Sequence, residues 1–290
     1  MMYAIGPLAV NGANLKMNDL CGGLPSPGGF LGFAGALARQ FGLDGWAPSV
    51  LPVLHDVQVS PGRIKGGVRG GKPVPLEVPE DITGAFLATL LIDFPEEVRE
   101  SELKEAVLSR RLCGGNVFPA ADGRRDGGRT WAAPSDTSAR CVRAVSAADG
   151  SVLSDLPRGY AVVPARELSA LPVTNGADAH VETLVDVLHP EDGVRQEAGY
   201  LVPVAAGYRL IEEPVPAGAR TGTRDAVTRH AFAEPLMTIG EMVSVRSSRL
   251  RDLDAEGLRA VSWRWHSAGA DRLFSPLLAS DPVTTEETST

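Results

Sequence analysis

The sequence contains few cysteines and no long apolar run. Its three cysteines, Cys21, Cys113 and Cys141, are widely spaced and form no C-x-x-C pair. This spacing supports neither a disulfide framework nor a zinc site, so we expect structural thiols. No apolar stretch reaches the roughly 18 residues that span a bilayer. The opening "MMYAIGPLAV" lacks the basic region and cleavage site of a secretory signal. We therefore expect a cytoplasmic protein that does not bind a membrane.

The sequence also lacks the common catalytic motifs. It has no G-x-S-x-G elbow and no G-x-x-x-x-G-K-[ST] loop. His55 and Asp56 form a pair found in metal-dependent phosphohydrolases, but the other histidines show no H-x-x-x-H or comparable spacing. His55 with Arg63 or Lys65 has the groups that a metal-independent ribonuclease needs, a general base and a cation. The alternative is a structural histidine at the end of a strand.

Charge is distributed unevenly along the chain. The formal net charge of −8 argues against a stand-alone nucleic-acid binder. However, residues 57–76 hold four basic residues and no acidic one, and residues 108–145 hold seven arginines against three aspartates. Residues 146–200 instead hold nine acidic residues against three arginines. The pattern predicts a basic and an acidic face, unless these segments are ordinary solvated loops.

Hydrophobic periodicity predicts an α+β fold. Apolar runs alternate with segments of helical pattern, and their order is β-α-β-β-α-β, which is the ferredoxin-like arrangement shared by RNA-recognition (RRM-like) folds. The predicted strands and helices, in chain order, are 3–10, 27–41, 50–59, 84–93, 95–110 and 111–118. Gly114 and Gly115 interrupt the last strand.

The helix predicted at 27–41 is rich in glycine. Ser26 is a good N-cap and Pro27 suits the first helical position. Its four glycines, Gly28, Gly29, Gly32 and Gly35, together cost roughly 2–4 kcal/mol of helix propensity. Glycine permits close approach by a sheet, another subunit or a phosphate backbone, and the free N–H groups at the helix start suit an anion.

The second half of the sequence is less regular. The basic loop 60–80 suits an element that orders on a partner, or an ordinary surface loop. Residues 123–140 predict an excursion from the body, 199–214 one or two strands, 233–247 another strand, and 254–267 a helix. We expect a ferredoxin-like body at 1–120, an excursion with a β-rich elaboration at 121–275, and an acidic, flexible tail at 276–290; the family resemblance given below makes the excursion thumb-like.

Six motifs in register resemble one family. They cover most of the chain from about residue 8 to residue 266, and they are "VNGANLKMNDLCGGLPSPGGFLGFAGALARQFG", "LHDVQV", "RRLCGGNVF", "GYLVPVAAGYRLI", "TRDAVTRHAFAEPLMTIGEMVS" and "LRAVSWRWH". Together they are similar to the Csy two family, the Cas five subunit of the subtype I-F CRISPR surveillance complex (Csy complex, or Cascade). The chain departs from that pattern at Met242, where an aromatic is expected, and at "VRSSRL", which replaces a segment containing proline and histidine.

The resemblance implies a fold, a function and partners. It implies a ferredoxin-like body of the RAMP superfamily with an inserted thumb. It also implies a cytoplasmic ribonucleoprotein subunit that binds the 5′ handle of CRISPR RNA (crRNA) with the large subunit, abuts a backbone subunit and supports recognition of target DNA in antiviral defence. Another protein cuts the RNA in this subtype, so we expect no enzyme activity, metal or cofactor. The alternatives are a Cas five endoribonuclease that processes precursor crRNA, and a protein-only assembly factor.

The resemblance and the charge pattern together give the candidate RNA-binding residues. Amides at the end of the first strand suit base edges and sugar hydroxyls, and basic side chains suit phosphates. The candidates are Asn11, Asn14, Lys16, Ser26, His55, Arg63, Lys65, Arg69, Lys72, Arg110, Arg111, Arg124, Arg125, Arg129, Arg246 and Arg249.

Overall fold

The predicted order of strands and helices is present in the first part of the chain. The computed structural model describes residues 1–17, 22–60, 67–69, 71–74, 82–119, 143–146, 148–165, 200–223, 225–268 and 273–278. Up to residue 119 the main elements are β1 (Met2–Asn14), α1 (Pro27–Gln40), β2 (Ser49–Val59), β5 (Thr83–Asp93), α2 (Glu100–Leu108), β6 (Arg111–Leu112) and β7 (Gly115–Pro119). Strands β2, β5, β1 and β7 lie side by side in that order, and each neighbouring pair is antiparallel. The structure therefore agrees with the predicted α+β class.

The strand beside β1 is made of two separate segments. β7 pairs with Leu8–Asn11 of β1, and β8 (Arg143–Ser146) pairs with Tyr3–Gly6 on the same strand. Both run antiparallel to β1, so β8 continues the line that β7 begins. The chain thus leaves this strand position after Pro119 and returns to it at Arg143. The excursion predicted at 123–140 lies in that interval, outside the described residues.

The second half of the chain extends the same sheet. β9 (Tyr160–Pro164), β11 (Ala233–Ser244), β10 (Tyr200–Leu210), β13 (Leu273–Leu278) and β12 (Trp263–Ala268) follow β2 in that order. β12 also pairs with the start of β2, at Val50 and Ser49. Trp263 is buried at this junction, and its indole N–H donates to the carbonyl of Val162 in β9 at 2.8 Å.

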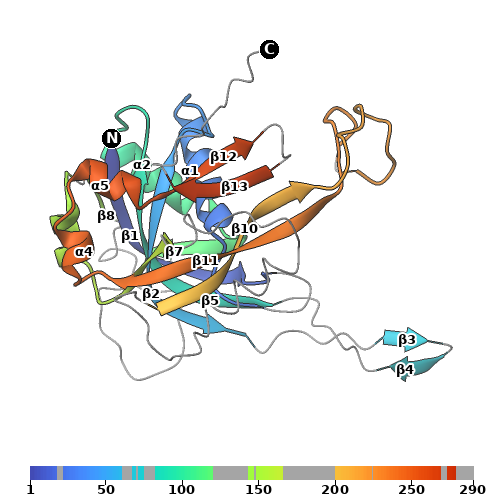
Figure 1. Cartoon of the computed structure of the whole chain (residues 1–290), viewed down its shortest axis with the longest axis horizontal. Coiled ribbons are helices and arrows are strands. Elements are labelled where there is room, and N and C mark those ends of the chain that lie inside the picture. Colours follow the sequence, from blue (N-terminus) through green and yellow to red (C-terminus); the bar gives the residue numbers. More distant parts are fainter. Residues whose placement is uncertain are drawn as a thin grey trace, which may run out of the picture.

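Both faces of the sheet carry buried apolar clusters. One cluster joins the sheet to α1 and α2 and includes Phe30, Leu37, Phe86 and Leu103. The other lies under the 3-10 helix η1 (Gly150–Asp155), α4 (Ser248–Arg251) and α5 (Ala255–Ala260). Successive side chains of a strand point to opposite faces, so β1 contributes Tyr3 and Ile5 to the first cluster and Met2 and Ala4 to the second. Figure 1 shows α4 and α5 at the opposite end of the molecule from the small hairpin of β3 (Gly67–Arg69) and β4 (Lys72–Val74).

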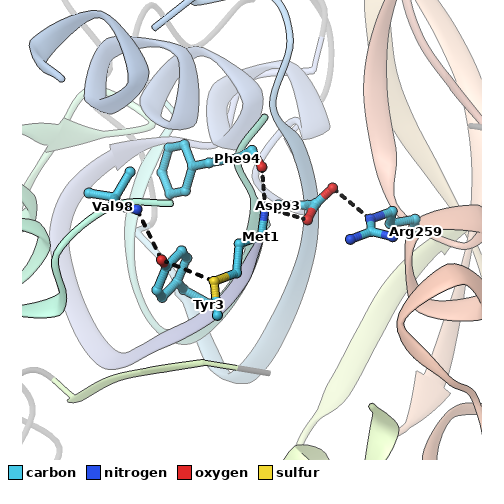
Figure 2. A network of polar contacts seen from close by, with 6 residues as sticks. All are labelled: Met1, Tyr3, Asp93, Phe94, Val98 and Arg259. Atoms are coloured by element: carbon cyan, nitrogen blue, oxygen red, sulfur yellow. Dashed lines mark hydrogen bonds and ion pairs between the residues drawn. The ribbon is translucent and has the colours of Figure 1, made fainter. Parts of the chain in front are cut away.

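A polar network links the first residue to α5 (Figure 2). The Asp93 carboxylate accepts from the Arg259 Nε–H at 2.8 Å and lies 3.4 Å from the amino group of Met1. That amino group also donates to the carbonyl of Phe94. Nearby, the Tyr3 hydroxyl accepts from the backbone N–H of Val98 at 3.0 Å. These contacts connect the start of β1 and the end of β5 to α5 on one face of the sheet and to the segment before α2 on the other.

Two predicted helices differ from the observed elements. The helix predicted at 95–110 begins at Glu100, because the Val98 N–H is bonded to Tyr3 and Arg99 is still extended. The helix predicted at 254–267 ends at Ala260, and residues from Trp263 onward form β12. Pairing of Trp263 with Val50 of β2 outweighs the local helical pattern there.

The glycines of α1 face tight intramolecular contacts. A Cβ at Gly29 would lie 2.6 Å from the sulfur of Cys113, and one at Gly35 would overlap the carbonyl oxygen of Gly45. A Cβ at Gly28 would lie 3.4 Å from the ring of Trp265, whereas at Gly32 no atom lies within 4 Å. Packing within the chain therefore accounts for Gly29 and Gly35 but not for Gly32.

None of the helices in the described ranges has the length and apolar character needed to cross a membrane.

Candidate nucleic-acid interface

A bulge in β1 places the two predicted asparagines on one face of the sheet. Asn11 pairs with Ala85 of β5, and Asn14 pairs with Thr83. A regular strand would send residues three apart to opposite faces, but the register shifts between Asn11 and Ala13. Gly12 lies at this shift with a φ of +72°, which suits glycine. Both asparagines are exposed.

The glycine-rich turn after α2 brings Arg111 to the same face. Leu112 pairs with Gly115, so Cys113 and Gly114 form a two-residue hairpin loop, and their φ values are +50° and +82°. Positive φ at both positions is typical of the type I′ turn that joins twisted antiparallel strands. A Cβ at Gly115 would lie 2.9 Å from the backbone oxygen of Asn11, so glycine lets this turn pack against β1. Arg111 then pairs with Asn116 of β7.

The thiol of Cys113 is enclosed by this packing. The residue is partly exposed as a whole, and its sulfur packs against Gly29 of α1. Burial raises the pKa of the Cys113 thiol well above its ordinary range. The expectation of a structural thiol at this position agrees with its packing. Cys21 and Cys141 lie outside the described residues.

Arg110 and Lys16 flank this end of the sheet. Arg110 is exposed, and its guanidinium donates to the side-chain oxygen of Gln40 at 2.8 and 3.2 Å. This contact joins the ends of α1 and α2. The backbone N–H of Lys16 donates to the Asn14 side-chain oxygen at 2.9 Å. Lys16 is therefore held directly beside Asn14.

The basic loop forms a hairpin beyond the same end of the sheet. β3 and β4 are antiparallel, with Arg69 paired to Lys72, and the hairpin extends away from the main sheet (Figure 1). Lys72 is exposed, and only the backbone of Arg69 is described. The hairpin connects β2, which ends at Val59, to β5, which begins at Thr83. The predicted Arg63, Lys65, Arg124, Arg125 and Arg129 lie outside the described residues.

Ser26 and His55 make internal contacts. Ser26 caps α1 by accepting from the Gly28 N–H at 3.1 Å, and its hydroxyl donates to the Ala205 carbonyl at 3.0 Å. His55 lies 2.9 Å from the Thr89 hydroxyl through Nε2 and 3.2 Å from the Arg158 carbonyl through Nδ1. Burial lowers the pKa of His55, and hydrogen bonds to backbone carbonyls oppose this shift. Their roles in RNA binding stay predictions.

Arg246 contacts η1, and Arg249, which lies in α4, contacts β11. Arg246 donates to the carbonyls of Ser154 at 2.5 Å and Leu156 at 2.8 Å, at the end of η1. Arg249 forms a two-bond ion pair with Glu241 of β11, at 2.5 and 3.0 Å. The Glu241 side chain is 5% exposed and that of Arg249 is 45% exposed. These contacts stabilise the second layer, and RNA binding by either residue stays a prediction.

Three of the predicted residues thus meet on one sheet surface. Asn11, Asn14 and Arg111 share the face opposite α1 and α2, at the end of the sheet from which the basic hairpin extends. Sequence reasoning missed Asn116, which pairs directly with Asn11. The sequence feature that could have identified Asn116 is its position directly after Gly114 and Gly115, where the second strand of a hairpin begins. In the described ranges, no three His, Cys, Asp or Glu side chains gather closely enough to hold a metal ion.

Comparison with known proteins identifies the family. The family described as CRISPR-associated protein (Cas_Csy2) matches residues 88–275, which is more than half of the 290 residues. The match spans the Arg111 hairpin, the strands β9 to β11 and the Arg249 ion pair. The comparison with curated proteins gives no match. The chain belongs to the Cas_Csy2 family of CRISPR-associated proteins.

Proposed function

We propose that this Csy subunit is a non-catalytic RNA-binding component of a type I-F surveillance complex. In this proposal it binds the 5′ handle of crRNA together with the large subunit and abuts a backbone subunit. The assembled ribonucleoprotein then recognises target DNA in antiviral defence. Family membership supports a place in a Csy complex. The strand order β2-β5-β1-β7, with a helix after β1 and another after β5, supports a ferredoxin-like body of the RAMP type.

One observation carries the RNA-binding role. Two amides and an arginine project from one face of the sheet, at the end where β2 finishes and β5 starts, the two strands that the basic hairpin connects. Amides offer both a donor and an acceptor to base edges and 2′-hydroxyls, while arginine adds a positive charge for phosphates. An exposed sheet surface suits single-stranded RNA, because the bases of a single strand are free to be contacted. The positive charge of Arg111 and the hairpin thus favours RNA binding at this surface, although the net charge of the whole chain is −8.

The contacts of His55 favour a non-catalytic role. A general base needs a free nitrogen within hydrogen-bond reach of the substrate. Both ring nitrogens of His55 already lie within hydrogen-bond distance of Thr89 and Arg158. The Arg158 carbonyl only accepts, so Nδ1 carries the proton and Nε2 faces the Thr89 hydroxyl. We therefore assign His55 to the structure rather than to RNA cleavage.

A native-gel titration tests the proposal. The full chain, alone and with the large subunit, is mixed with the repeat-derived 5′ handle or with a scrambled RNA of equal length. Selective binding of an intact handle supports the proposal. Failure to bind either RNA, with or without the large subunit, contradicts it and favours an assembly factor. Cleavage of the handle favours the endoribonuclease alternative.

The basic hairpin gives a second readout. For a single strand, the slope of log affinity against log salt becomes shallower by about 0.7 for each phosphate that the protein no longer neutralises. The double variant Arg69→Ala/Lys72→Ala is therefore expected to bind RNA more weakly and with a slope shallower by about 1.4. The matched control is Arg99→Ala/Arg251→Ala, which removes the same charge from exposed positions in the helical layers. An equal effect of both double variants would show that only the net charge matters.

A further inference from the structure

The strand register aligns a polar row across five neighbouring strands. Arg111 of β6 pairs with Asn116 of β7, and Asn116 pairs with Asn11 of β1. Asn11 pairs with Ala85 of β5, and Ala85 pairs with Gln58 of β2. Directly opposed residues in antiparallel strands place their side chains on the same face. We name Arg111, Asn116, Asn11, Ala85 and Gln58 the amide row.

Burial along each strand confirms that the row shares one face. Arg111, Asn116, Asn11 and Gln58 are exposed, and Ala85 is partly exposed. The adjacent residues in the chain belong to, or pack against, the core under α1 and α2, and they are Leu112, Val117, Val10, Phe86 and Val57. The amide row therefore lies on the opposite face, away from both helices. At about 4.8 Å between neighbouring strands, it spans roughly 19 Å.

A second row with an apolar surface lies beside the amide row. Phe118, Ala9, Leu87 and Asp56 are paired in turn across β7, β1, β5 and β2, two residues along each strand from the amide row. Phe118 and Ala9 are partly exposed, and Leu87 is 9% exposed. Asp56 stands at one end of this row. Phe118 provides an aromatic ring next to Asn116, and aromatic rings are the side chains on which unpaired bases stack.

The chemistry of the amide row favours base contacts over phosphate contacts. Three of its five side chains are amides, each with donors and an acceptor and no charge. Amides contribute little to general attraction for phosphates, but they distinguish bases by their edges. Arg111 on β6 supplies charge at one end of the row, and the basic hairpin of β3 and β4 follows β2, the strand of Gln58, along the chain. A strand crossing the row would have its phosphates neutralised on both sides.

We propose that the amide row reads base edges of a single-stranded RNA segment that crosses the sheet from the basic hairpin to Arg111. Asn116 and Gln58 are the specificity residues that this register adds to Asn11. The inference rests on the proposed function and assigns the handle-reading surface to this face. A paired RNA helix does not fit, because a flat sheet cannot reach base edges in the narrow A-form groove.

Binding measurements on amide variants test the inference. Asn116→Ala, Gln58→Ala and the double variant are compared with the native chain by fluorescence anisotropy, with the large subunit present. The probes are the labelled 5′ handle and a base-shuffled RNA of equal length. Each single variant is expected to bind the handle about tenfold more weakly, while its affinity for the shuffled RNA and its salt slope stay unchanged. Ser101→Ala, which removes an exposed polar side chain from α2, is the matched control.

The outcomes separate this inference from the proposed function. The inference would be overturned if both amide variants bound the handle with native affinity. The proposed function would stay intact in that case if the Arg69→Ala/Lys72→Ala variant bound the handle more weakly. Loss of affinity for both RNAs to the same degree would also overturn it, since the amides would then lack base selectivity. No binding by the native complex would overturn the proposed function itself. Thermal unfolding of each variant checks that its fold is retained, and Asn116→Asp supplies a second substitution at the same site.

Discussion

Asn11 of β1 and Asn116 of β7 are direct partners in an antiparallel ladder, so their amides lie next to each other on one exposed face. This relationship depends on two glycine-dependent features. The bulge at Gly12 lets β1 continue to Asn14 on the same face, and the turn at Cys113 and Gly114 returns the chain beside β1. The polar surface is therefore a product of backbone conformation as much as of the amide residues themselves.

The bulge gives the first prediction. Gly12 has a positive φ, and no atom lies within 4 Å of a Cβ built there, so a side chain has room but the backbone is strained. Gly12→Ala is expected to lower the free energy of unfolding by about 1 kcal/mol. Gly12→Asn is expected to lose less, because asparagine tolerates the left-handed region better. Urea unfolding of the two variants measures both values, and equal losses would contradict this account of the bulge.

The glycines of α1 give the second prediction. Gly32→Ala is expected to raise the free energy of unfolding by about 0.5–1 kcal/mol, because alanine favours a helix and meets open space there. Gly35→Ala is expected to lower the free energy of unfolding, because its Cβ would overlap the Gly45 carbonyl oxygen. The two substitutions are chemically identical and lie on one helix, so urea unfolding compares only their surroundings. Stabilisation by both would show that the Gly45 loop moves aside freely.

Local signals were enough to predict most of the first half of the fold. Ser26, Pro27 and the apolar spacing after them predicted α1, whose observed bounds are Pro27–Gln40. The runs at 50–59 and 84–93 likewise predicted β2 and β5 almost to the residue. These elements are strongly periodic and have clear ends, so neighbouring residues determine them. The helix predicted at 254–267 is present only from Ala255 to Ala260, and its second part was wrong because Trp263 pairs with β2, which is a contact between distant parts of the chain.

The candidate interface was only partly predictable for the same reason. Asn11 and Arg111 were predicted from the family resemblance together with their local context, at a strand end and beside a glycine turn. Gln58 and Asn116 were not, because only the register of β2 and β7 places them in the same row as Asn11. Arg249 has an ordinary surface sequence context, yet it pairs with the buried Glu241. Long-range pairing of this kind cannot be deduced from one sequence.

The ion pair between Arg249 and Glu241 gives the third prediction. Arg249→Ala is expected to lower the free energy of unfolding by about 2–3 kcal/mol, because it takes two hydrogen bonds from a buried carboxylate. Arg251→Ala removes an exposed arginine from the same helix and is the matched control, with an expected change within about 0.5 kcal/mol. Urea unfolding without RNA measures both variants. Native stability of Arg249→Ala, combined with weaker RNA binding, would restore its predicted role as an RNA contact.

The environment of His55 gives the fourth prediction, a dependence of stability on pH. Burial lowers the pKa of His55 below the ordinary value of about 6.5 that applies in the unfolded chain. When the pH falls through about 6.5, the unfolded chain takes up a proton at His55 and the folded chain does not, so the unfolded state is favoured. His55 therefore makes the protein lose stability progressively from about pH 6.5 down to the lowered pKa of the folded state. Above about pH 6.5 it has no such effect, because the residue is neutral in both states.

The substitution His55→Asn isolates this contribution. Urea unfolding between about pH 5 and about pH 7.5 is expected to give a shallower pH dependence for the variant than for the native chain, since one source of preferential proton uptake by the unfolded state is gone. His230→Asn is the matched control for loss of a histidine, because His230 lies in the loop between β10 and β11, where its backbone pairs with Val215. Equal slopes for native and His55→Asn proteins would mean that His55 takes up a proton in the folded state as readily as in the unfolded chain. His55 would then regain the accessible nitrogen that a general base requires, and the endoribonuclease alternative would gain support.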